Sequence, residues 1–478
     1  MRTFDLCVIG SGPGGAKAAI AAAKLGKSVA IIEKMDVVGG VAINTGTIPS
    51  KALREAVLAL TSARQVLTGA GCLAGAICPQ SSEQELQQLT GQCHRVIAAE
   101  VGILRSQLLS NGVEIINGAA AFVDGKTIRV STRTGRGEET VTAKNFVIGV
   151  GSTPARPGNI AFDEKNILTS DEVLKLGSLP RSMIVVGGGV IGTEYASMLA
   201  ALGVRVTLIE GRPRLLEFID TEIGEALQYH LRQMGVTLRM GEKVVSIKGV
   251  EPPRGARSSD GLMAEATLES GKTIVADSLM YCVGRQGATS GLNLEAAGLS
   301  ADNRGRITVD GNYRTSQEHI YAVGDVIGFP ALASTSMEQG RLAALHMYGE
   351  PAEQFADLLP YGIYSIPEIS MVGWTEERLT AEGIPFESGV AQYKEIARGQ
   401  LLGDSIGMLK LLIHQETHAV LGAHAIGSQA TELIHIAQAV MAFKGTVEYF
   451  VNTVFNYPTL AECYKVAAYN GLNKLRSA

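Results

Sequence analysis

The hydrophobic pattern at the N-terminus predicts two strands with a helix between them. Residues 4–9 and 28–32 are short, largely apolar runs, and they flank an alanine-rich stretch at 13–25. Short runs of this kind are typical of strands buried on both faces of a parallel sheet, whereas small apolar residues over three turns favour a packed helix. The pattern therefore predicts a βαβ unit at the start of the chain.

The same pattern returns in the middle of the chain. Residues 182–186 form an apolar run, a glycine turn follows, 190–202 read as a helix, and 204–209 form a second apolar run. A repeated βαβ unit with a glycine-rich first turn is typical of dinucleotide-binding domains. The two copies predict two dinucleotide sites in one chain.

The segment between the two units is expected to complete the first domain. It contains a helical stretch at 51–109 and short β-like pieces at 113–123 and 127–131. A Gly/Pro-containing crossing at 145–157 indicates a domain boundary. The polar stretch 251–261 is interpreted as a surface hairpin of the second domain.

The last third of the chain changes character. A strand-turn-helix transition at 315–326 is interpreted as a return to the first domain. Beyond it, 407–414 and 419–426 predict two alternating strands, and 431–443 predict a helix. These elements predict an α+β C-terminal domain.

The composition is typical of a globular protein in a reducing compartment. The 478 residues allow about three domains at roughly 100–200 residues each, and 46% of them are hydrophobic. The net charge of −5 provides no basic face, so nucleic acid is not expected as a partner. No secretory signal and no apolar run near the roughly 18–20 residues of a membrane span is visible. The six cysteines include no C-x-x-C pair, so we expect a soluble, cytoplasmic protein without a disulfide framework.

Both predicted turns carry the G-x-G-x-x-G spacing of dinucleotide sites. In each unit an acidic residue ends the next strand, 21 residues after the middle glycine. Such glycines let backbone amides approach a pyrophosphate, and the acidic residue binds a ribose hydroxyl. A single match would be equally consistent with a tight structural turn, but two matched units favour nucleotide binding. The residues are Gly10, Gly12, Gly15 and Glu33 in the first unit and Gly187, Gly189, Gly192 and Glu210 in the second.

The segment 39–51 distinguishes the two sites. It reads G-G-V-A-I-N-T-G-T-I-P-S-K and resembles the G-G-x-C-x-N-x-G-C-x-P-S-K signature of flavoprotein disulfide reductases, as 315–325 resembles their T-x-x-x-x-I-Y-A-x-G-D segment. The resemblance covers the whole chain and implies that the first unit binds FAD. Besides the glycines and Glu33, the implied FAD-binding residues are Lys34, Gly39, Gly40, Val41, Gly46, Lys51, Gly118, Gly151, Asp325 and Ala333.

Departures from that signature change the expected chemistry. Ala42 and Thr47 replace both cysteines, and Tyr457 replaces the histidine of the family's C-terminal H-P-T-x-x-E segment. Neither replacement can form a redox disulfide, and a tyrosine is a poor proton shuttle for a thiol near neutral pH. Segments 46–54 and 455–473 are similar to the soluble (Si-specific) pyridine nucleotide transhydrogenases. That resemblance implies catalytic or positioning roles for Thr47, Lys51, Glu194, Tyr457 and Glu462, with Lys51 and Glu194 paired beside the flavin.

The second unit is expected to bind the nicotinamide nucleotides. Glu210 favours the free 2′-hydroxyl of NAD, whereas Arg212 and Arg214 can pair with the 2′-phosphate of NADP or lie solvated in a loop. Val190 stands where some relatives place an aromatic gate, which indicates a more open nicotinamide pocket. The remaining expected NAD(P) residues are Gly187, Gly189, Gly192, Glu194 and Gly284.

These observations predict an α/β fold with two Rossmann-like domains, for FAD and NAD(P), and a C-terminal α+β dimerisation domain. The expected boundaries are 1–150 and 279–345 for the FAD domain, 151–278 for the NAD(P) domain and 346–478 for the interface domain. The expected function is ping-pong hydride transfer between NADPH and NAD in a homodimer, with FAD as cofactor and no metal. Two alternatives stay open, an NAD(P)H oxidase or quinone diaphorase and a non-catalytic flavin-binding assembly protein. Cys72 and Cys78 are interpreted as incidental thiols.

Overall fold

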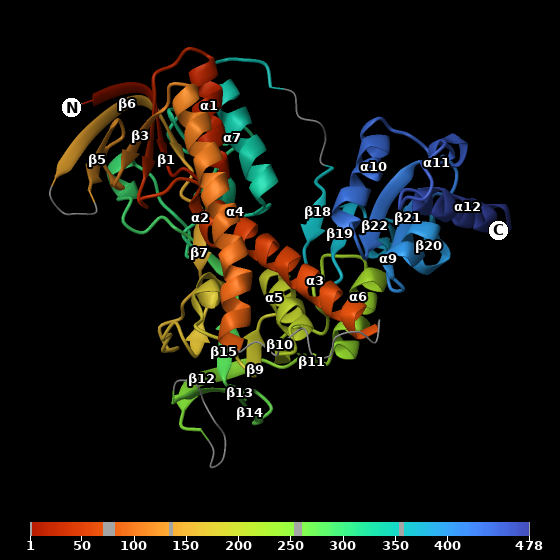
Figure 1. Ribbon diagram of the computed structural model, residues 1–478. Coiled ribbons are helices and arrows are strands. Elements are labelled where there is room, and N and C mark those ends of the chain that lie inside the picture. The colour runs from red at the N-terminus through yellow and green to blue at the C-terminus, as the bar shows by residue number, and fades with distance from the viewer. Residues whose placement is uncertain (1, 70–81, 133–136, 253–260, 353–357, 478) are drawn as a thin grey trace.

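The structure, a computed structural model, describes residues 2–69, 82–132, 137–252, 261–352 and 358–477 (Figure 1). Three groups of strands follow one another along the chain, each with its own helices. The predicted α/β architecture with a C-terminal α+β part is confirmed.

The first sheet is built around the N-terminal βαβ unit. Its order is β3-β2-β1-β6-β5-β4, and β17 pairs with β6 in parallel, so the predicted return of the chain places a strand in this sheet. The helix α1 (Pro13–Lys24) lies against α7 (Ala333–Met347), as Figure 1 shows. Their approach is close, because a Cβ at Gly340 would lie 2.0 Å from the carbonyl oxygen of Gly14. The strands are β1 (Arg2–Ile9), β2 (Val29–Glu33), β3 (Glu114–Asn117), β4 (Ala119–Asp124), β5 (Thr127–Ser131), β6 (Glu138–Ile148) and β17 (Ile320–Ala322).

The helical stretch predicted at 51–109 consists of two helices rather than one. They are α3 (Thr47–Gly69) and α4 (Ser82–Ser110), preceded by the short α2 (Gly40–Asn44). Helix α3 begins at Thr47, earlier than the sequence pattern predicts, because Pro49 is compatible with the first turn, where its missing N–H has no helical partner.

The second sheet is fully parallel and contains the second βαβ unit. Its order is β11-β10-β9-β15-β8, with α5 (Val190–Ala201) and α6 (Thr221–Gln233) among its helices. A separate antiparallel sheet has the order β12-β13-β14, and the stretch interpreted as a hairpin joins β12 to β13, although 253–260 lie outside the described residues. Strand β15 ends at Tyr281, beyond the boundary expected at 278. The strands are β8 (Ile167–Leu168), β9 (Ser182–Val186), β10 (Arg205–Glu210), β11 (Thr237–Met240), β12 (Val244–Val250), β13 (Met263–Leu268), β14 (Thr273–Ala276) and β15 (Ser278–Tyr281).

The two crossings between these domains run side by side. Strand β7 (Ser152–Pro154) leaves the first domain and pairs antiparallel with β16 (Arg285–Gly287), which leaves the second. The short 3₁₀ segments are η1 (Ser170–Lys175), η2 (Leu294–Ala297) and η3 (Gly324–Ile327).

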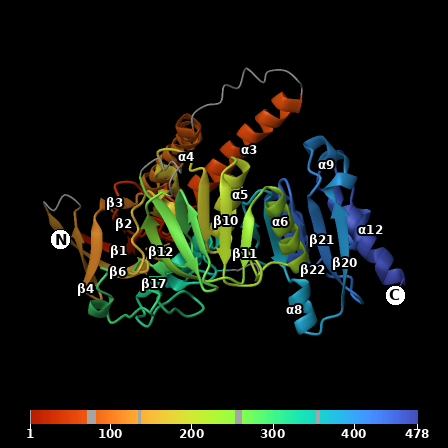
Figure 2. The same cartoon turned by 90° about the horizontal axis from the view of Figure 1, so that it is seen from below.

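The C-terminal domain is an antiparallel sheet of order β18-β19-β22-β21-β20, with α10 packed against β19 and β22. Helix α12 packs against β20 and β21, as Figure 2 shows. The expected alternation is wrong for both β21 and β22, which are buried along almost their whole length. Helices α10 and α12 cover these strands on one side, and the second domain covers them on the other, where Lys410 of β21 pairs with Asp220. The elements are β18 (Tyr361–Ile363), β19 (Ile369–Gly373), α8 (Glu376–Ala381), β20 (Phe386–Gln392), η4 (Tyr393–Glu395), α9 (Ala397–Leu402), β21 (Met408–His414), β22 (Val420–Ile426), α10 (Ala430–Ala442), α11 (Glu448–Asn452) and α12 (Glu462–Ser477).

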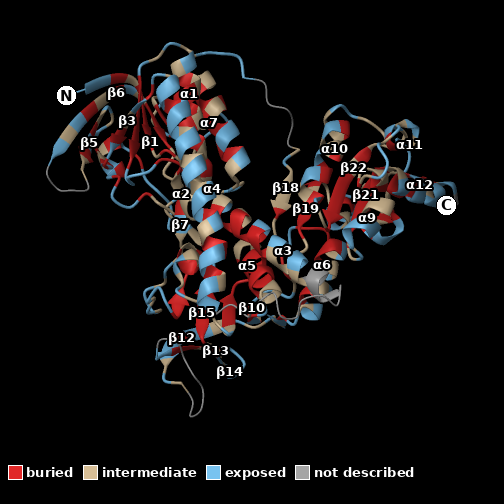
Figure 3. Cartoon of the chain, viewed as in Figure 1, coloured by how far each residue is buried: buried red, intermediate tan, exposed pale blue. Residues whose placement is uncertain are grey.

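Buried residues follow the strands and the inner faces of the helices (Figure 3). One core cluster joins the three parts of the chain, because Leu53 of α3 packs in the same cluster as Met198 of α5 and Ile363 of β18. Helix α3 therefore connects the first unit to both other domains. Within the described ranges, no helix is long and apolar enough to cross a membrane.

Candidate active site

The first glycine turn leaves open space where a pyrophosphate would lie. Gly10 has a φ of 101°, and a Cβ at Gly15 would lie 2.0 Å from the carbonyl oxygen of Gly10, so both glycines are required by the turn itself. A Cβ at Gly12 would meet nothing nearer than 3.9 Å. Gly12 is also the N-cap of α1 and provides no side-chain cap, so the first amides of the helix point toward this space.

A network around Glu33 holds the first turn to the segment of the family signature. The buried Glu33 carboxylate accepts bonds from the Ser11 amide at 3.1 Å, the Ser11 hydroxyl at 2.5 Å and the Met35 amide at 2.9 Å. The Ser11 hydroxyl in turn accepts a bond from the Gly39 amide at 2.9 Å. Ser11 was missed by sequence reasoning, because it stands at a variable position of the glycine motif.

The Asp325 carboxylate lies at the junction of the two crossing strands. It accepts a bond from the Ser152 hydroxyl at 2.6 Å, and Arg285 donates to that hydroxyl at 2.8 Å and to the Ser152 carbonyl oxygen at 2.8 Å. The Nε atom of Arg285 is 3.9 Å from Asp325. Ser152 and Arg285 are separated by 133 residues in sequence, so only the pairing of β7 and β16 reveals this contact.

The other residues expected to bind FAD border the same region of backbone. Gly40 faces the first turn, and a Cβ there would lie 2.9 Å from the Gly12 Cα atom, so the two glycine segments form a cradle that side chains would fill. This cradle, together with the uncapped start of α1, fits the pyrophosphate of a dinucleotide such as FAD. The remaining positions are Lys34, exposed after β2; Gly39 and Val41, at the start of α2; Gly46, before α3; Gly118, whose amide donates to the Glu33 carbonyl oxygen; Gly151, with a φ of 67°; and Ala333, the first residue of α7.

The expected ion pair between Lys51 and Glu194 is present and joins the two nucleotide units. The Lys51 Nζ atom lies 2.9 Å from each oxygen of the buried Glu194 carboxylate. The amide of Tyr364, from the C-terminal domain, donates to the same carboxylate at 2.9 Å, and Lys51 Nζ lies 4.8 Å from the Tyr364 ring centroid. Glu194 lies just beyond the first turn of α5, which begins at Val190. All three domains therefore contribute to this position.

The structure does not bring the C-terminal candidates to that pair. Tyr457, which is 73% exposed, lies between α11 and α12, and Glu462 is the first residue of α12, far from α5 in Figure 1. Within the described ranges, no hydrogen bond or ion pair joins either residue to Lys51 or Glu194, and the Oε2 atom of Glu462 is buried without a partner in the chain. Thr47, exposed at the start of α3, precedes Lys51 by one helical turn.

The second glycine turn repeats the geometry of the first. Gly187 has a φ of 105°, a Cβ at Gly192 would lie 1.9 Å from the carbonyl oxygen of Gly187, and a Cβ at Gly189 would meet nothing within 4 Å. Gly189 occupies the N-cap position of α5 and offers no side-chain hydrogen bond to the helix, as Gly12 does at the start of α1. The expected residues Val190, at the start of α5, and Gly284, with a φ of 85°, are neighbours of this turn in the chain and in the sheet. The turn fits a second dinucleotide.

Glu210 is engaged by Arg212 on both of its oxygens. Arg212 donates from Nε at 3.0 Å and from Nη2 at 3.0 Å, its amide donates at 2.9 Å, and the Gly188 amide donates at 2.7 Å. Burial acts to raise the pKa of Glu210, but the bonds from Arg212 and Gly188 outweigh it and the pKa is lowered. The bond to Glu210 also raises the pKa of Arg212. The acidic residue expected at the ribose is thus neutralised by the arginine expected at the phosphate.

The Arg214 side chain points away from Glu210 and toward the C-terminal domain. Its Nη1 atom donates to the Thr221 hydroxyl, and Thr221 donates through its own hydroxyl and amide to Glu377 of α8 in the C-terminal domain. The two arginines expected at a 2′-phosphate are therefore separated. The structure places Arg212 at Glu210 and holds Arg214 toward the domain contact.

The described cysteines show no sign of redox chemistry. Cys7, Cys93, Cys282 and Cys463 are free thiols, and burial raises the pKa of Cys93 to about 11 and that of Cys282 to about 12. Such thiols are poor nucleophiles. Cys72 and Cys78 lie outside the described residues. In the described part of the chain, no group of three or more His, Cys, Asp or Glu side chains is arranged to hold a metal ion.

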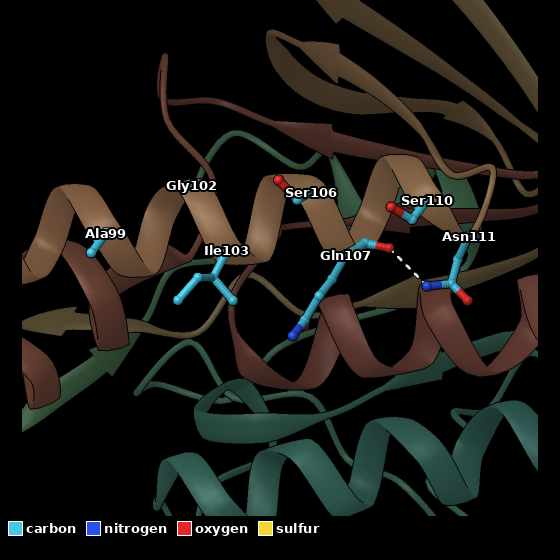
Figure 4. A pocket seen from close by; sticks show the side chains of 7 residues that line it. All are labelled: Ala99, Gly102, Ile103, Ser106, Gln107, Ser110 and Asn111. Atoms are coloured by element: carbon cyan, nitrogen blue, oxygen red, sulfur yellow. Dashed lines mark hydrogen bonds between the residues drawn. The ribbon is translucent and has the colours of Figure 1, made fainter.

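A shallow depression lies along the outward face of α4 (Figure 4). Its lining carries no ionisable side chain, and the side-chain amide of Asn111 donates to the Gln107 carbonyl oxygen at 2.8 Å. It offers no group for acid, base or redox chemistry. The lining residues are Ala99, Gly102, Ile103, Ser106, Gln107, Ser110 and Asn111.

Comparisons with known proteins agree with this geometry. Residues 4–340 match the family model described as pyridine nucleotide-disulphide oxidoreductase, and 359–468 match its dimerisation domain. A protein of Mycobacterium tuberculosis strain H37Ra named soluble pyridine nucleotide transhydrogenase is 53% identical, covering 100% of this chain and 99% of its own length. A protein of the same name from Vibrio vulnificus strain YJ016 is 46% identical, covering 99% and 98%. The crystal structure of LpdA from Mycobacterium tuberculosis superposes with a TM-score of 0.86 at 26% identity, covering 98% of this chain and 99% of that one.

Proposed function

The chain belongs to the pyridine nucleotide-disulphide oxidoreductase family, where its full-length similarity groups it with the soluble pyridine nucleotide transhydrogenases, and we propose that it is an FAD-dependent NAD(P)+ transhydrogenase of the Si-specific type. The observation that carries the proposal is the Lys51–Glu194 pair between two intact dinucleotide turns, in a chain with Ala42 and Thr47 at the positions of the family's disulfide. The chain retains what hydride transfer needs and lacks, at those positions, the thiols that disulfide reduction needs.

The first unit is proposed to hold FAD. The turn from Gly10 to Gly15 and the start of α1 would bind the pyrophosphate, Glu33 a ribose hydroxyl and Asp325 the ribityl chain. Bound there, FAD supplies a ring nitrogen, N5, that accepts hydride from one nicotinamide and gives it to another. Lys51 would place a positive charge beside that ring, and Glu194 and the Tyr364 amide fix the position of the lysine.

The second unit is proposed to bind NADPH and NAD in turn, which makes the reaction ping-pong. Gly189 leaves the space for the nucleotide pyrophosphate, and the chain shows one such exchangeable unit besides the FAD unit. The guanidinium of Arg212 is hydrogen-bonded to Glu210 and can turn to pair with a 2′-phosphate instead. One site could therefore accept both nucleotides. With NAD, Glu210 would accept the 2′-hydroxyl instead.

The C-terminal domain is proposed to form a homodimer, which its family description supports. Tyr457 is largely exposed and is therefore accessible to a second subunit's flavin, and Glu462, which is only partly buried at the start of α12, is proposed to lie beside it there. Thr47 and Tyr457 would act there by shape and hydrogen bonding, without accepting electrons. A cytoplasmic location is part of the same proposal, supported by the relatives' names and by the absence of any C-x-x-C pair from the sequence.

The test is anaerobic stopped-flow absorbance of the purified flavoprotein. Stoichiometric NADPH should reduce the flavin, and subsequent mixing with NAD should reoxidise it and produce NADH. A flavin that stays reduced until oxygen or a quinone is admitted would make the protein an oxidase or diaphorase. A flavin that NADPH does not reduce would favour a non-catalytic assembly protein.

A further inference from the structure

A short connection in the C-terminal domain is hydrogen-bonded to both nucleotide units. Residues 364–368 join β18 to β19 and lie beside α3 and α5 (Figure 1). The Tyr364 amide donates to the Glu194 carboxylate of α5 at 2.9 Å. The Ile366 amide donates to the Ser197 hydroxyl at 2.9 Å, and that hydroxyl donates to the carbonyl oxygen of Glu194 at 2.8 Å. These bonds attach the connection to the helix that carries Glu194.

Arg54 of α3 holds the same connection at two other points. Its Nε atom donates to the Ser365 carbonyl oxygen at 3.0 Å, and its Nη2 atom lies 2.9 Å from the Glu368 carboxylate. The Nη1 atom pairs with the exposed Glu55 at 2.7 Å. Glu368 also accepts bonds from the amide and hydroxyl of Thr431, at the start of α10, at 3.1 and 3.2 Å. One guanidinium therefore fixes both the backbone and a side chain of residues 364–368.

These contacts reach the Lys51–Glu194 pair directly. Arg54 stands three residues after Lys51, so both side chains leave the same face of α3. Tyr364, whose neighbour Arg54 holds, has its ring centroid 4.8 Å from Lys51 Nζ and its amide on Glu194. A shift of this connection would remove both contacts together. The position of the Lys51 ammonium therefore depends on what holds the connection in place.

Stability alone does not account for the Arg54–Glu368 pair. Both side chains are only 6% exposed. Removing two charges from water costs free energy that their attraction only partly returns, and apolar side chains of similar size often stabilise a fold as well. The planar guanidinium provides something that they cannot, because it donates several bonds in fixed directions. The pair therefore has the properties of a device that fixes geometry.

We propose that Arg54 is a positioning residue for hydride transfer, which fixes residues 364–368 against Glu194 and thereby holds the Lys51 ammonium beside the flavin ring. This inference rests on the proposed function, since it requires FAD in the first unit. Arg54 acts through Tyr364 and Lys51. Its replacement should therefore change the rate of hydride transfer and the midpoint potential of the flavin, but not the binding of the nucleotide.

The test is the variant Arg54→Lys, which keeps a cation for the buried Glu368 but loses the planar set of donors. Anaerobic stopped flow of the holoenzyme at increasing NADPH gives the saturating rate constant of flavin reduction and the dissociation constant of NADPH. The rate constant should fall about 10-fold, less than in Lys51→Met, because Lys51 is displaced rather than removed. The dissociation constant should change by less than about twofold. The midpoint potential of the flavin, titrated without nucleotide, should become more negative, because the reduced ring loses part of its stabilising charge.

A double variant separates positioning from general damage to the fold. Because Arg54 acts through Lys51, Arg54→Lys should have almost no further effect on the reduction rate in the Lys51→Met background. Lys410→Met is the matched control, since it removes another buried cation at a domain contact, 2.9 Å from Asp220. Measured well below its melting temperature, this variant should keep a reduction rate within about twofold of the original.

Hydrogen exchange measured by mass spectrometry reports on the connection without turnover. In the Arg54→Lys holoenzyme, the amides of Tyr364 and Ile366 should exchange faster, because the backbone that carries them has lost an anchor. The amides of β21, which Arg54 does not contact, should exchange at an unchanged rate.

Three results would overturn the proposal. The first is an unchanged reduction rate in Arg54→Lys, and the second is an equal fractional loss with and without Lys51, which would make the two residues independent. The third is unchanged exchange of the Tyr364 and Ile366 amides. If NADPH reduced the flavin but NAD did not reoxidise it, the proposed function would fail while the role of Arg54 stood. If NADPH did not reduce the flavin, the midpoint potential and the hydrogen exchange would still decide the role of Arg54.

Discussion

Replacing Arg212 by alanine tests whether one guanidinium sets the choice between NAD and NADP. In the structure the Arg212 side chain donates two hydrogen bonds to Glu210, each at 3.0 Å, and 45% of this side chain is exposed. In the NADP complex it would pair with the 2′-phosphate instead. A charge-assisted bond contributes about 1.5–3 kcal/mol, and the exposure of Arg212 favours a smaller value of about 1–2 kcal/mol.

That magnitude predicts a 5- to 30-fold loss of NADP+ affinity in Arg212→Ala. The affinity for NAD+ should change by less than about threefold, because Glu210 keeps the Gly188 amide that orients it and remains available to the ribose hydroxyl. Titration calorimetry with the oxidised holoenzyme measures both. Arg214→Ala is the matched control, since the structure directs Arg214 to Thr221 and should leave the NADP+/NAD+ ratio nearly unchanged.

Equal losses for both nucleotides in Arg212→Ala would refute the reasoning, because they would mean that the arginine supports the loop rather than reading the phosphate. A large selective loss in Arg214→Ala with none in Arg212→Ala would also refute it. Either result would show that the guanidinium on Glu210 stays there when NADP binds.

Further predictions concern the Lys51–Glu194 pair, the first glycine turn, the buried Lys410 and pH. Lys51→Met should slow flavin reduction by NADPH about 100-fold in stopped flow, because a preorganised charge at the reacting ring is lost; an unchanged rate would remove Lys51 from the chemistry. Gly12→Ala should fold but purify with little FAD, as measured by the ratio of flavin to protein absorbance. Gly15→Ala should in addition lower the melting temperature, because its Cβ would lie 2.0 Å from a carbonyl oxygen. Lys410→Met should destabilise the protein by about 3–5 kcal/mol in denaturant unfolding, because Asp220, 2.9 Å away and 1% exposed, would lose its buried partner; a loss below 1 kcal/mol would contradict this. Glu210, whose folded pKa is lowered from 4.5, should stabilise the fold above pH 4.5 and lose that contribution as pH falls through the folded pKa. Unfolding free energies measured from pH 6 to pH 3 should therefore fall less steeply in Glu210→Gln.

The two βαβ units with their glycine turns could be predicted from the sequence, for a local reason. A strand, a glycine turn and a helix are specified within about thirty residues, and the spacing from Gly10 to Gly15 follows from backbone geometry that does not depend on the rest of the chain. The structure shows both turns with the expected geometry, and the Lys51–Glu194 pair as well. The replacement of the two signature cysteines by Ala42 and Thr47 is visible in the sequence alone.

Side chains that meet from distant segments could not be predicted in the same way. Ser152 and Arg285 contact Asp325 because two crossing strands pair, and the Tyr364 amide reaches Glu194 across 170 residues of sequence. No periodicity encodes such contacts, since they depend on how completed domains pack. Strands β21 and β22 were predicted to alternate but are almost entirely buried, because the second domain that covers them is not visible in a local pattern.

The two arginines that follow Glu210 show what the sequence and the tertiary structure each determine. The sequence by itself determined that Glu210 is followed by two arginines, and hence that both NAD and NADP were candidates. Only the tertiary structure decided that Arg212 turns back to Glu210 while Arg214 reaches Thr221. The rotamer of each side chain depends on the hydrogen-bond partners around it, which differ between these two positions.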